Sequence, residues 1–219
     1  MSDLPDWLPE FRAWPKIPRL NREVTVSEKI DGTNSCVCVS DDGTKIAAQS
    51  RTKWITPKDD NYGFARWVEE NREELLRLGP GHHYGEYWGA GINRKYGLTE
   101  RRFSLFNTHR WTEERPKCCH VVPVLWKGNY QDMLLHEILF KLTVEGSVAA
   151  PGFQKPEGIV IFHHAADQYF KVLAEGDELP KGITTLKERE VQAKLRGPDL
   201  SDPEIAKAVA EMHGGSADF

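Results

Sequence analysis

The stretch Glu28-Lys29-Ile30-Asp31-Gly32-Thr33-Asn34 separates two runs in which apolar and polar residues alternate with the period of a β-strand. Residues 24–28 form the first run and residues 35–39 form the second. Asp-Gly between two such runs is typical of a hairpin turn, so we expect Lys29 to lie in an antiparallel meander. A solvated lysine in a polar turn would have no chemical role. A lysine fixed between strands, with a carboxylate two residues later, suits a covalent lysyl intermediate, and both interpretations stay open for this stretch alone.

Apolar and polar residues alternate in several further segments of the chain, which predicts many strands and few helices. Such an interleaved pattern indicates an α+β fold. Strands are expected over residues 45–51, 82–88, 103–107, 121–126, 158–162 and 168–173, and helices over residues 63–78 and 133–142.

The 219 residues and the 39% hydrophobic content are enough for one substantial core, so we expect one domain. Residues 1–22 combine prolines with large apolar side chains and are expected to lie as a strap over the main body. Residues 23–175 form the expected catalytic core. Residues 176–219 are expected to add a short helical cap, with helices over 185–195 and 203–213 and without a larger C-terminal OB domain.

The net charge of −4 excludes a global positive field, so any site for a polyanion must be a local basic patch. Apolar runs stay well short of the roughly 20 residues that span a bilayer, and the N-terminus does not resemble a signal peptide. These patterns predict a cytoplasmic protein without a membrane partner. The four cysteines fit this prediction, because they stand in two close pairs that suit neither a disulfide framework nor the usual spacing of zinc ligands.

Short motifs occur along the chain in a defined order, each on or beside an expected strand. The series resembles the motifs of the covalent nucleotidyltransferase superfamily, which comprises ATP-dependent DNA and RNA ligases and mRNA capping enzymes. This resemblance covers about residues 12–173 and implies a fold of two packed, largely antiparallel sheets with flanking helices. Its elements are Lys29-x-Asp31-Gly32, Ser50-Arg51, Gly85-Glu86, Phe103 with Phe106, Glu157-Gly158, and Lys171.

The residue two places after the motif glycine narrows the resemblance. Arginine is usual there in DNA ligases and capping enzymes, whereas this chain has Asn34. The ending Gly32-Thr33-Asn34 is similar to that of RNA ligases of the phage T4 RNA ligase 2 type. An asparagine replaces a fixed cation with a neutral hydrogen-bonding group, so it changes how a nucleotide or a polynucleotide end is held.

The resemblance also implies roles for individual side chains. Lys29 is the implied nucleophile, and Asp31 and Lys171 are the implied further catalytic residues. Asp31, Glu86 and Glu157 are candidate ligands for Mg²⁺, for which Mn²⁺ is a substitute. The residues implied to bind ATP are Glu28, Lys29, Asn34, Arg51, Glu86, Phe106, Glu157 and Lys171.

Within this set, Glu28 is expected to recognise adenine, and Phe106 to offer a face to the adenine ring. Arg51 offers a forked donor for phosphate or ribose, and Glu86 can hold ribose hydroxyls instead of the metal. Simpler interpretations remain for several of them. An aromatic residue in a strand is often core, and a charge on an edge strand is often only solvated.

The last motif departs from the family. Relatives commonly carry two lysines spaced K-x-K, whereas this chain has Lys171 alone. Either Leu173 replaces the second lysine of the pair or Tyr169 replaces the first, and the sequence leaves both alternatives open.

An RNA substrate would need a basic surface. Besides Asn34, the candidates are basic residues in one region of the sequence: Arg94, Lys95, Arg101, Arg102, Arg110, Arg115 and Lys117, which Lys53 and Lys58 extend. The alternative is a solvated face whose cations are balanced by neighbouring glutamates.

Together, the motifs predict an ATP-dependent RNA ligase that joins a 5′-phosphate RNA end to a 3′-hydroxyl end, with a possible protein partner for substrate choice. A minimal nick-sealing DNA ligase and a non-catalytic module that binds nucleotides or RNA ends remain the alternatives.

Overall fold

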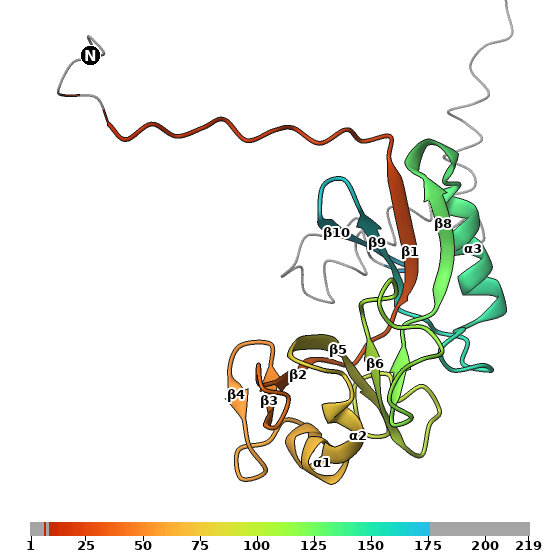
Figure 1. The fold of residues 1–219 in the computed structure, drawn as a ribbon. Helices are drawn as coiled ribbons and strands as arrows, with labels where there is room; N and C mark the ends of the chain where they lie inside the picture. The colour runs from red at the N-terminus through yellow and green to blue at the C-terminus, as the bar shows by residue number, and fades with distance from the viewer. Residues whose placement is uncertain (1–6, 8, 176–219) are drawn as a thin grey trace, which may run out of the picture. The chain divides into compact units, whose positions relative to one another are not determined.

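The structure is a computed structural model that describes residues 7 and 9–175 (Figure 1). These residues contain ten strands, three α-helices and one 3-10 helix. The strands are β1 (Glu23–Lys29), β2 (Thr33–Val39), β3 (Ile46–Ser50), β4 (Trp54–Ile55), β5 (Gly81–Gly89), β6 (Arg101–Leu105), β7 (Cys119–Val121), β8 (Val124–Asn129), β9 (Gly158–His163) and β10 (Gln168–Leu173); the helices are α1 (Phe64–Glu70), α2 (Arg72–Leu76), η1 (Tyr130–Asp132) and α3 (Leu135–Glu145).

The strands form two sheets, as the sequence predicted. One sheet has four strands in the order β10-β9-β1-β8, and the other has six in the order β4-β3-β2-β5-β6-β7. Neighbouring strands are antiparallel except for β6 and β7, which run parallel. The expected α+β fold is therefore confirmed. Within the described part of the chain, every helix is too short or too polar to cross a membrane.

Each sheet has one apolar face, and helices cover it. In the four-stranded sheet, Val26 and Ile161 pair across the β1–β9 ladder and pack with Leu142 of α3. In the six-stranded sheet, Val37 packs with Phe64 of α1. Figure 1 shows α3 beside β8, and α1 and α2 beside the six-stranded sheet. The opposite face of each sheet is left for polar side chains.

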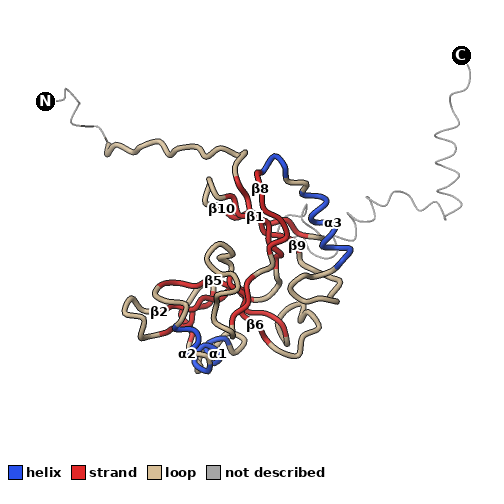
Figure 2. The backbone as a smooth tube through the Cα atoms, turned by 45° about the vertical axis from the view of Figure 1, so that its right-hand side comes forward, coloured by secondary structure: helices blue, strands red, loops and turns tan. Residues whose placement is uncertain are grey.

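The chain crosses from one sheet to the other at residues 30–32, because β1 and β2 belong to different sheets (Figure 2). The predicted hairpin at this point is therefore wrong, and the meander of β2, β3 and β4 begins only after the crossing. Ile30 is 4% exposed and packs with Trp88 and Tyr96 in a separate small cluster. A buried apolar residue suits a crossing between sheets better than the tip of a hairpin, which faces water.

Two other predicted elements are interrupted. The helix expected over residues 63–78 breaks at Asn71, whose side-chain amide donates a hydrogen bond to the carbonyl oxygen of Trp67. The strand expected over residues 121–126 divides into β7 and β8 around Pro123. Proline has no N–H for a ladder, and here the chain crosses between the sheets a second time. The helices expected over 185–195 and 203–213 lie outside the described residues.

The N-terminal segment does not pack as a strap in this structure. Phe11 is 87% exposed and Trp14 is 86% exposed, so these rings have no apolar surface against them. The segment contains three prolines between residues 9 and 18, which favour extended backbone and remove N–H donors. It is attached near β1, where the ring Nε2 of His163 lies 2.7 Å from the carbonyl oxygen of Leu20.

Candidate active site

The polar face of the four-stranded sheet carries both predicted lysines. Lys29 lies at the end of β1 opposite Gly158, and Gly158 lies opposite Leu173 on the neighbouring strand. Lys171 lies one row further back, opposite Val160. Residues two apart in a strand point to the same side, so this register places Lys29 and Lys171 on one face.

The polar face of the six-stranded sheet carries a second group of predicted residues. Asn34 pairs with Glu86 across β2 and β5, and Cys36 pairs with Tyr84 one row further along. These four side chains share a face, because each alternates with a residue that points into the core. Phe103 is 0% exposed in that core, so this motif aromatic has a packing role.

Lys29 forms an ion pair with Glu157, the residue just before β9. Its Nζ lies 2.6 Å from Oε2 of Glu157, and the two side chains are 23% and 18% exposed. The contact joins residues 128 positions apart in the chain. An ammonium group is not a nucleophile, so this lysine must lose a proton before it can attack, and Glu157 holds it in place meanwhile.

The crossover after Lys29 is held by a loop that follows β5. The backbone N–H of Asp31 donates to the hydroxyl of Tyr96 at 2.7 Å. The side-chain amide of Asn93 donates to Oδ1 of Asp31 at 2.8 Å and to the carbonyl oxygen of Gly32 at 2.6 Å. Motif reasoning missed Asn93 and Tyr96, and their only sequence signal was their position in a glycine-containing basic loop.

Arg94 connects the crossover with the segment before β9. Its Nε lies 3.0 Å from Oδ2 of Asp31, and its Nη1 donates to the carbonyl oxygen of Lys155 at 3.0 Å. Lys155 stands two residues before Glu157. One guanidinium group therefore ties together the two segments that carry the partners of the central ion pair.

Glu86 lies beneath the crossover and is only 7% exposed. Its Oε1 accepts a hydrogen bond from the N–H of Gly32 at 2.9 Å, and its Oε2 accepts one from the amide of Asn34 at 2.8 Å. Burial raises the pKa of Glu86 to about 7, because the loss of hydration outweighs these two donors. Near neutral pH this carboxyl group therefore exchanges a proton readily.

Glu28 has a different role from the one predicted. Adjacent residues in a strand point to opposite faces. Lys29 lies on the polar face of the four-stranded sheet, so the side chain of Glu28 points into the protein interior, where it is 1% exposed. Its carboxylate accepts hydrogen bonds from the hydroxyl of Ser147 at 2.5 Å and from the N–H groups of Val148 and Ala149 at 2.8 Å. Burial raises its pKa despite these donors. The expectation that Glu28 recognises adenine is corrected, because its oxygens are committed to the loop after α3.

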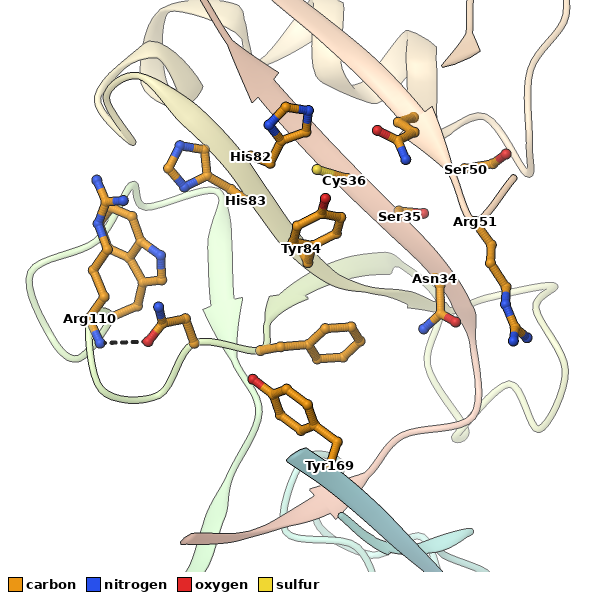
Figure 3. A pocket seen from close by; sticks show the side chains of 14 residues that line it. Asn34, Ser35, Cys36, Ser50, Arg51, His82, His83, Tyr84, Arg110 and Tyr169 are labelled. Atoms are coloured by element: carbon orange, nitrogen blue, oxygen red, sulfur yellow. Dashed lines mark hydrogen bonds between the residues drawn. The ribbon is translucent and has the colours of Figure 1, made fainter. Parts of the chain in front are cut away.

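A cavity of about 450 Å³ lies between the two polar faces (Figure 3). Asn34, Arg51 and Phe106 line it from the six-stranded side, and Tyr169 lines it from β10. Its size lies within the range of about 300–1,000 Å³ that is usual for small-molecule sites. Three residues that motif reasoning assigned to the nucleotide therefore share one cavity. Lys29, Glu86, Glu157 and Lys171 are not among the residues that line it, and Lys171 is exposed on the same strand as Tyr169.

The three candidate metal ligands do not converge. Asp31 contacts Asn93 and Arg94, and Glu86 and Glu157 have the partners given above. Across residues 7 and 9–175, no group of three or more His, Cys, Asp or Glu side chains is placed to hold a metal ion. Asp31, Glu86 and Glu157 therefore stay separate candidate ligands, and Glu157 is the one that contacts the amine of Lys29.

The predicted basic patch is divided among several local contacts. Arg101 donates to the carbonyl oxygens of Ala90 and Tyr62. The other three pairs are ionic: Arg102 with Glu100 at 2.7 Å, Lys53 with Asp59 at 2.5 Å, and Arg94 with Asp31 at 3.0 Å.

These contacts give several of the predicted RNA-binding cations a local partner within the protein. Arg101 holds loops together, and the charge of Arg102 and Lys53 is balanced by a neighbouring carboxylate, as the alternative interpretation expected. Lys95 is exposed in the loop that holds the crossover. The role of these residues in RNA binding stays a prediction.

A family model described as RNA ligase matches residues 22–173. No curated protein matches the chain significantly.

Solved structures match the same fold. A mutant of Naegleria gruberi RNA ligase with ATP and Mn has a TM-score of 0.52 and 18% identity, covering 77% of this chain and 58% of that one. A second mutant of the same ligase, with AMP and Mn, has a TM-score of 0.51 and 18% identity, covering 76% of this chain and 57% of that one. The matched region thus spans little more than half the length of these structures.

Proposed function

The chain belongs to the RNA ligase family, and from this premise we propose that it is an ATP-dependent RNA ligase that works through a covalent lysyl-AMP intermediate. Lys29 is the proposed nucleophile. The substrates are ATP and RNA ends that carry a 5′-phosphate and a 3′-hydroxyl.

One observation carries this proposal: Lys29 and Glu157 meet at 2.6 Å although they belong to motifs 128 residues apart. Their contact lies where β1 ends and the chain crosses to the second sheet, beside the polar faces of both sheets. A lysine held there by a carboxylate, with a nucleotide-sized cavity formed by neighbouring strands, suits the transfer of a nucleotidyl group.

In the first step, the deprotonated amine of Lys29 attacks the α-phosphorus of ATP. A phosphorus–nitrogen bond forms, the bond to the bridging oxygen breaks, and pyrophosphate leaves. Arg51 and Lys171 supply positive charge for the phosphoryl oxygens, since electrostatics and positioning provide most of the catalysis in phosphoryl transfer. Phe106 faces the cavity that would hold the base.

The donor set fits a divalent cation that is bound partly by substrate. Mg²⁺ usually uses one or two carboxylates together with phosphate oxygens and water, and Glu157 is the carboxylate placed for this role. When bound, the cation neutralises charge on the phosphates. Withdrawal of Glu157 from Lys29 would then favour loss of the ammonium proton to water, which leaves a neutral amine for the attack.

The later steps use the same cleft. A 5′-phosphate oxygen of RNA attacks the phosphorus of lysyl-AMP, and the amine of Lys29 leaves as the phosphorus–nitrogen bond breaks. A 3′-hydroxyl then attacks the 5′-phosphorus and AMP is released. Asn34 is placed beside Glu86 on the cleft face of β2, where it can orient either nucleotide.

Intact-mass spectrometry with ATP and Mg²⁺ tests the proposal. The parent protein should gain one adenylyl group and Lys29→Ala should gain none. Lys141→Ala, which removes an exposed lysine on α3, should behave as the parent does.

A second assay separates the first step from the last. Lys29→Ala should still join RNA whose 5′ end is already adenylylated, because that reaction needs no lysyl intermediate. If the parent forms no adduct even after pyrophosphate treatment to remove any AMP already bound, the protein is not a ligase of this type. Sealing of DNA 3′-hydroxyl ends in strong preference to RNA ends would instead favour the DNA ligase alternative.

A further inference from the structure

Three exposed aromatic rings lie next to the cleft without a role in the proposed chemistry. Trp54 on β4 is 59% exposed and Tyr84 on β5 is 54% exposed. The ring of His82 lies between them, 6.4 Å from that of Trp54 and 6.0 Å from that of Tyr84, to which it is nearly parallel at 18°. We call Trp54, His82 and Tyr84 the aromatic shelf.

The strand register explains why these rings share one surface. Trp54 pairs with Gln49, Gln49 pairs with Cys36, and Cys36 pairs with Tyr84, so one row crosses four strands on the cleft face. Cys36 is small, and the rings of Trp54 and His82 come within 6.4 Å of each other although β3 and β2 lie between their strands. Large rings over small neighbours leave flat faces open to solvent.

The shelf is continuous with the cavity of the candidate active site. His82 and Tyr84 line that cavity together with Asn34. Asn34 lies two residues from Cys36 along β2, so the shelf begins one row, or about 7 Å, from the row of Asn34 and Glu86. A chain that enters the cleft over this face would meet the shelf next to the nucleotide.

Two guanidinium groups flank the shelf. In Figure 3, His82 and Tyr84 lie between Arg51 and Arg110. Arg51 is exposed and has no side-chain hydrogen bond to any other described residue. Arg110 lies 4.6 Å from the ring of Trp111 and donates to the carbonyl oxygen of Leu78, and it faces the same cavity.

Aromatic rings on a sheet, with cations beside them, are the features that bind unpaired nucleotides. Bases stack on such rings whatever their identity, and cations contact the phosphates between them. A paired duplex hides its base faces and gains little from stacking. The surface therefore favours a single strand over a duplex.

We propose that the aromatic shelf binds unpaired nucleotides of the RNA strand whose end enters the cleft. This inference rests on the proposed RNA ligase function and names its substrate class: RNA ends with a single-stranded segment. Trp54 and His82 stack with bases and Arg110 contacts a flanking phosphate, while Arg51 stays at the phosphates of the nucleotide.

Fluorescence anisotropy with a short single-stranded RNA and with a blunt RNA duplex of the same sequence tests the shelf. Trp54→Ala and His82→Ala should each weaken binding of the single strand by about 5- to 100-fold, the range expected for the loss of one stacked base. Duplex affinity should change less than twofold. Trp54→Phe should recover most of the loss, because it keeps a ring.

Phe140→Ala is the matched control. This ring is 68% exposed, but it belongs to α3, the helix that packs against the four-stranded sheet. Equal binding of the single strand by Trp54→Ala and Phe140→Ala would overturn the proposal, as would an equal loss for single strand and duplex. Intact mass should show that Trp54→Ala still forms lysyl-AMP. If the parent itself forms no adduct, the proposed ligase function fails. The comparison of RNA binding by the parent and the variants still tests whether the aromatic shelf binds unpaired nucleotides.

Discussion

The crossover after Lys29 and the strand that carries Lys171 both face the cleft, but their backbones are held in different ways. In the crossover, the N–H of Asp31 is bound by Tyr96 and the N–H of Gly32 is bound by Glu86. β10 is an edge strand that pairs with β9 alone, and its residues 168–171 are all exposed.

The difference separates two requirements of the proposed reaction. The nucleophile needs a fixed position, because a displacement of about 1 Å can lower a rate by about 100-fold. A cation that neutralises the phosphates does not need so exact a position, because Coulomb attraction varies slowly with distance. A well-bonded crossover serves the first requirement, and an exposed edge strand is adequate for the second.

Gly32→Ala should produce the largest effect. A Cβ at this position would lie 2.4 Å from the carbonyl oxygen of Tyr87 and 2.7 Å from the Cβ of Trp88, so the backbone of the crossover must move. We expect the free energy of unfolding to fall by about 3 kcal/mol, and the rate of lysyl-AMP formation to fall by about 100-fold or more. Urea denaturation and single-turnover mass spectrometry measure the two quantities.

Gly43→Ala is the matched control for this substitution. Gly43 has a φ of +70° in the turn between β2 and β3, and its surroundings are open. Alanine should cost about 1 kcal/mol of stability there because of the left-handed backbone, without slowing adenylylation. An equal loss of activity in both variants would show that the crossover is not specially constrained.

Glu86→Gln should produce the next largest effect, and it should depend on pH. The pKa of Glu86 is raised from 4.5 to about 7 by burial, so the folded protein binds this proton more tightly than the unfolded chain does. The corresponding stability is fully present below pH 4.5 and is lost as the pH rises through 7, in total about 3 kcal/mol.

Glutamine stays neutral and lacks this dependence. In urea denaturation, the variant should therefore gain stability relative to the parent as the pH rises from 5 to 7, and the difference should level off above pH 7. Parallel stability curves for parent and variant over this range would contradict the buried, proton-exchanging state of Glu86.

Local patterns predicted much of the fold. Alternation over residues 168–173 gave the bounds of β10, and alternation over residues 24–28 gave the centre of β1. The alternation of apolar and polar residues does not indicate which sheet a strand joins. The Asp-Gly at residues 31–32 looks the same whether the chain reverses in a hairpin or passes to another sheet, and only the tertiary partners of Ile30 separate the two cases.

The parts of the candidate site that belong to the ordered motifs were predictable from the sequence. The order of motifs brought Lys29 and Glu157 together, although no local periodicity links them. The burial of Glu28 was predictable because successive side chains in a strand point to opposite faces, and its neighbour Lys29 lies on the polar face. The motif comparison did not take this alternation into account. The contacts of Arg101 were not predictable, since they depend on carbonyl oxygens that the sequence does not mark.

Leu173→Lys should produce the smallest effect and decide which lysine of the last motif is missing. Leu173 lies in the same ladder row as Gly158 and Lys29, whereas Tyr169 lies two rows further back, opposite Phe162. One strand, β9, lies between position 173 and Lys29, so the two positions are two strand spacings, or about 10 Å, apart. Two long side chains can span this distance around a phosphate.

A lysine at position 173 should therefore act as the absent second cation. Attraction between partly exposed charges is worth about 0.5–1 kcal/mol, so the concentration of ATP that gives half-maximal adenylylation should fall by about 2- to 5-fold. Tyr169→Lys is the comparison variant and should give a smaller gain, because it places its charge in the cavity beside Phe106, two rows from Lys29 and the phosphate that Lys29 attacks. The gain at position 173 should shrink as salt is added, as expected for an exposed charge. A larger gain from Tyr169→Lys would reverse the assignment and make Lys171 the second lysine of the pair.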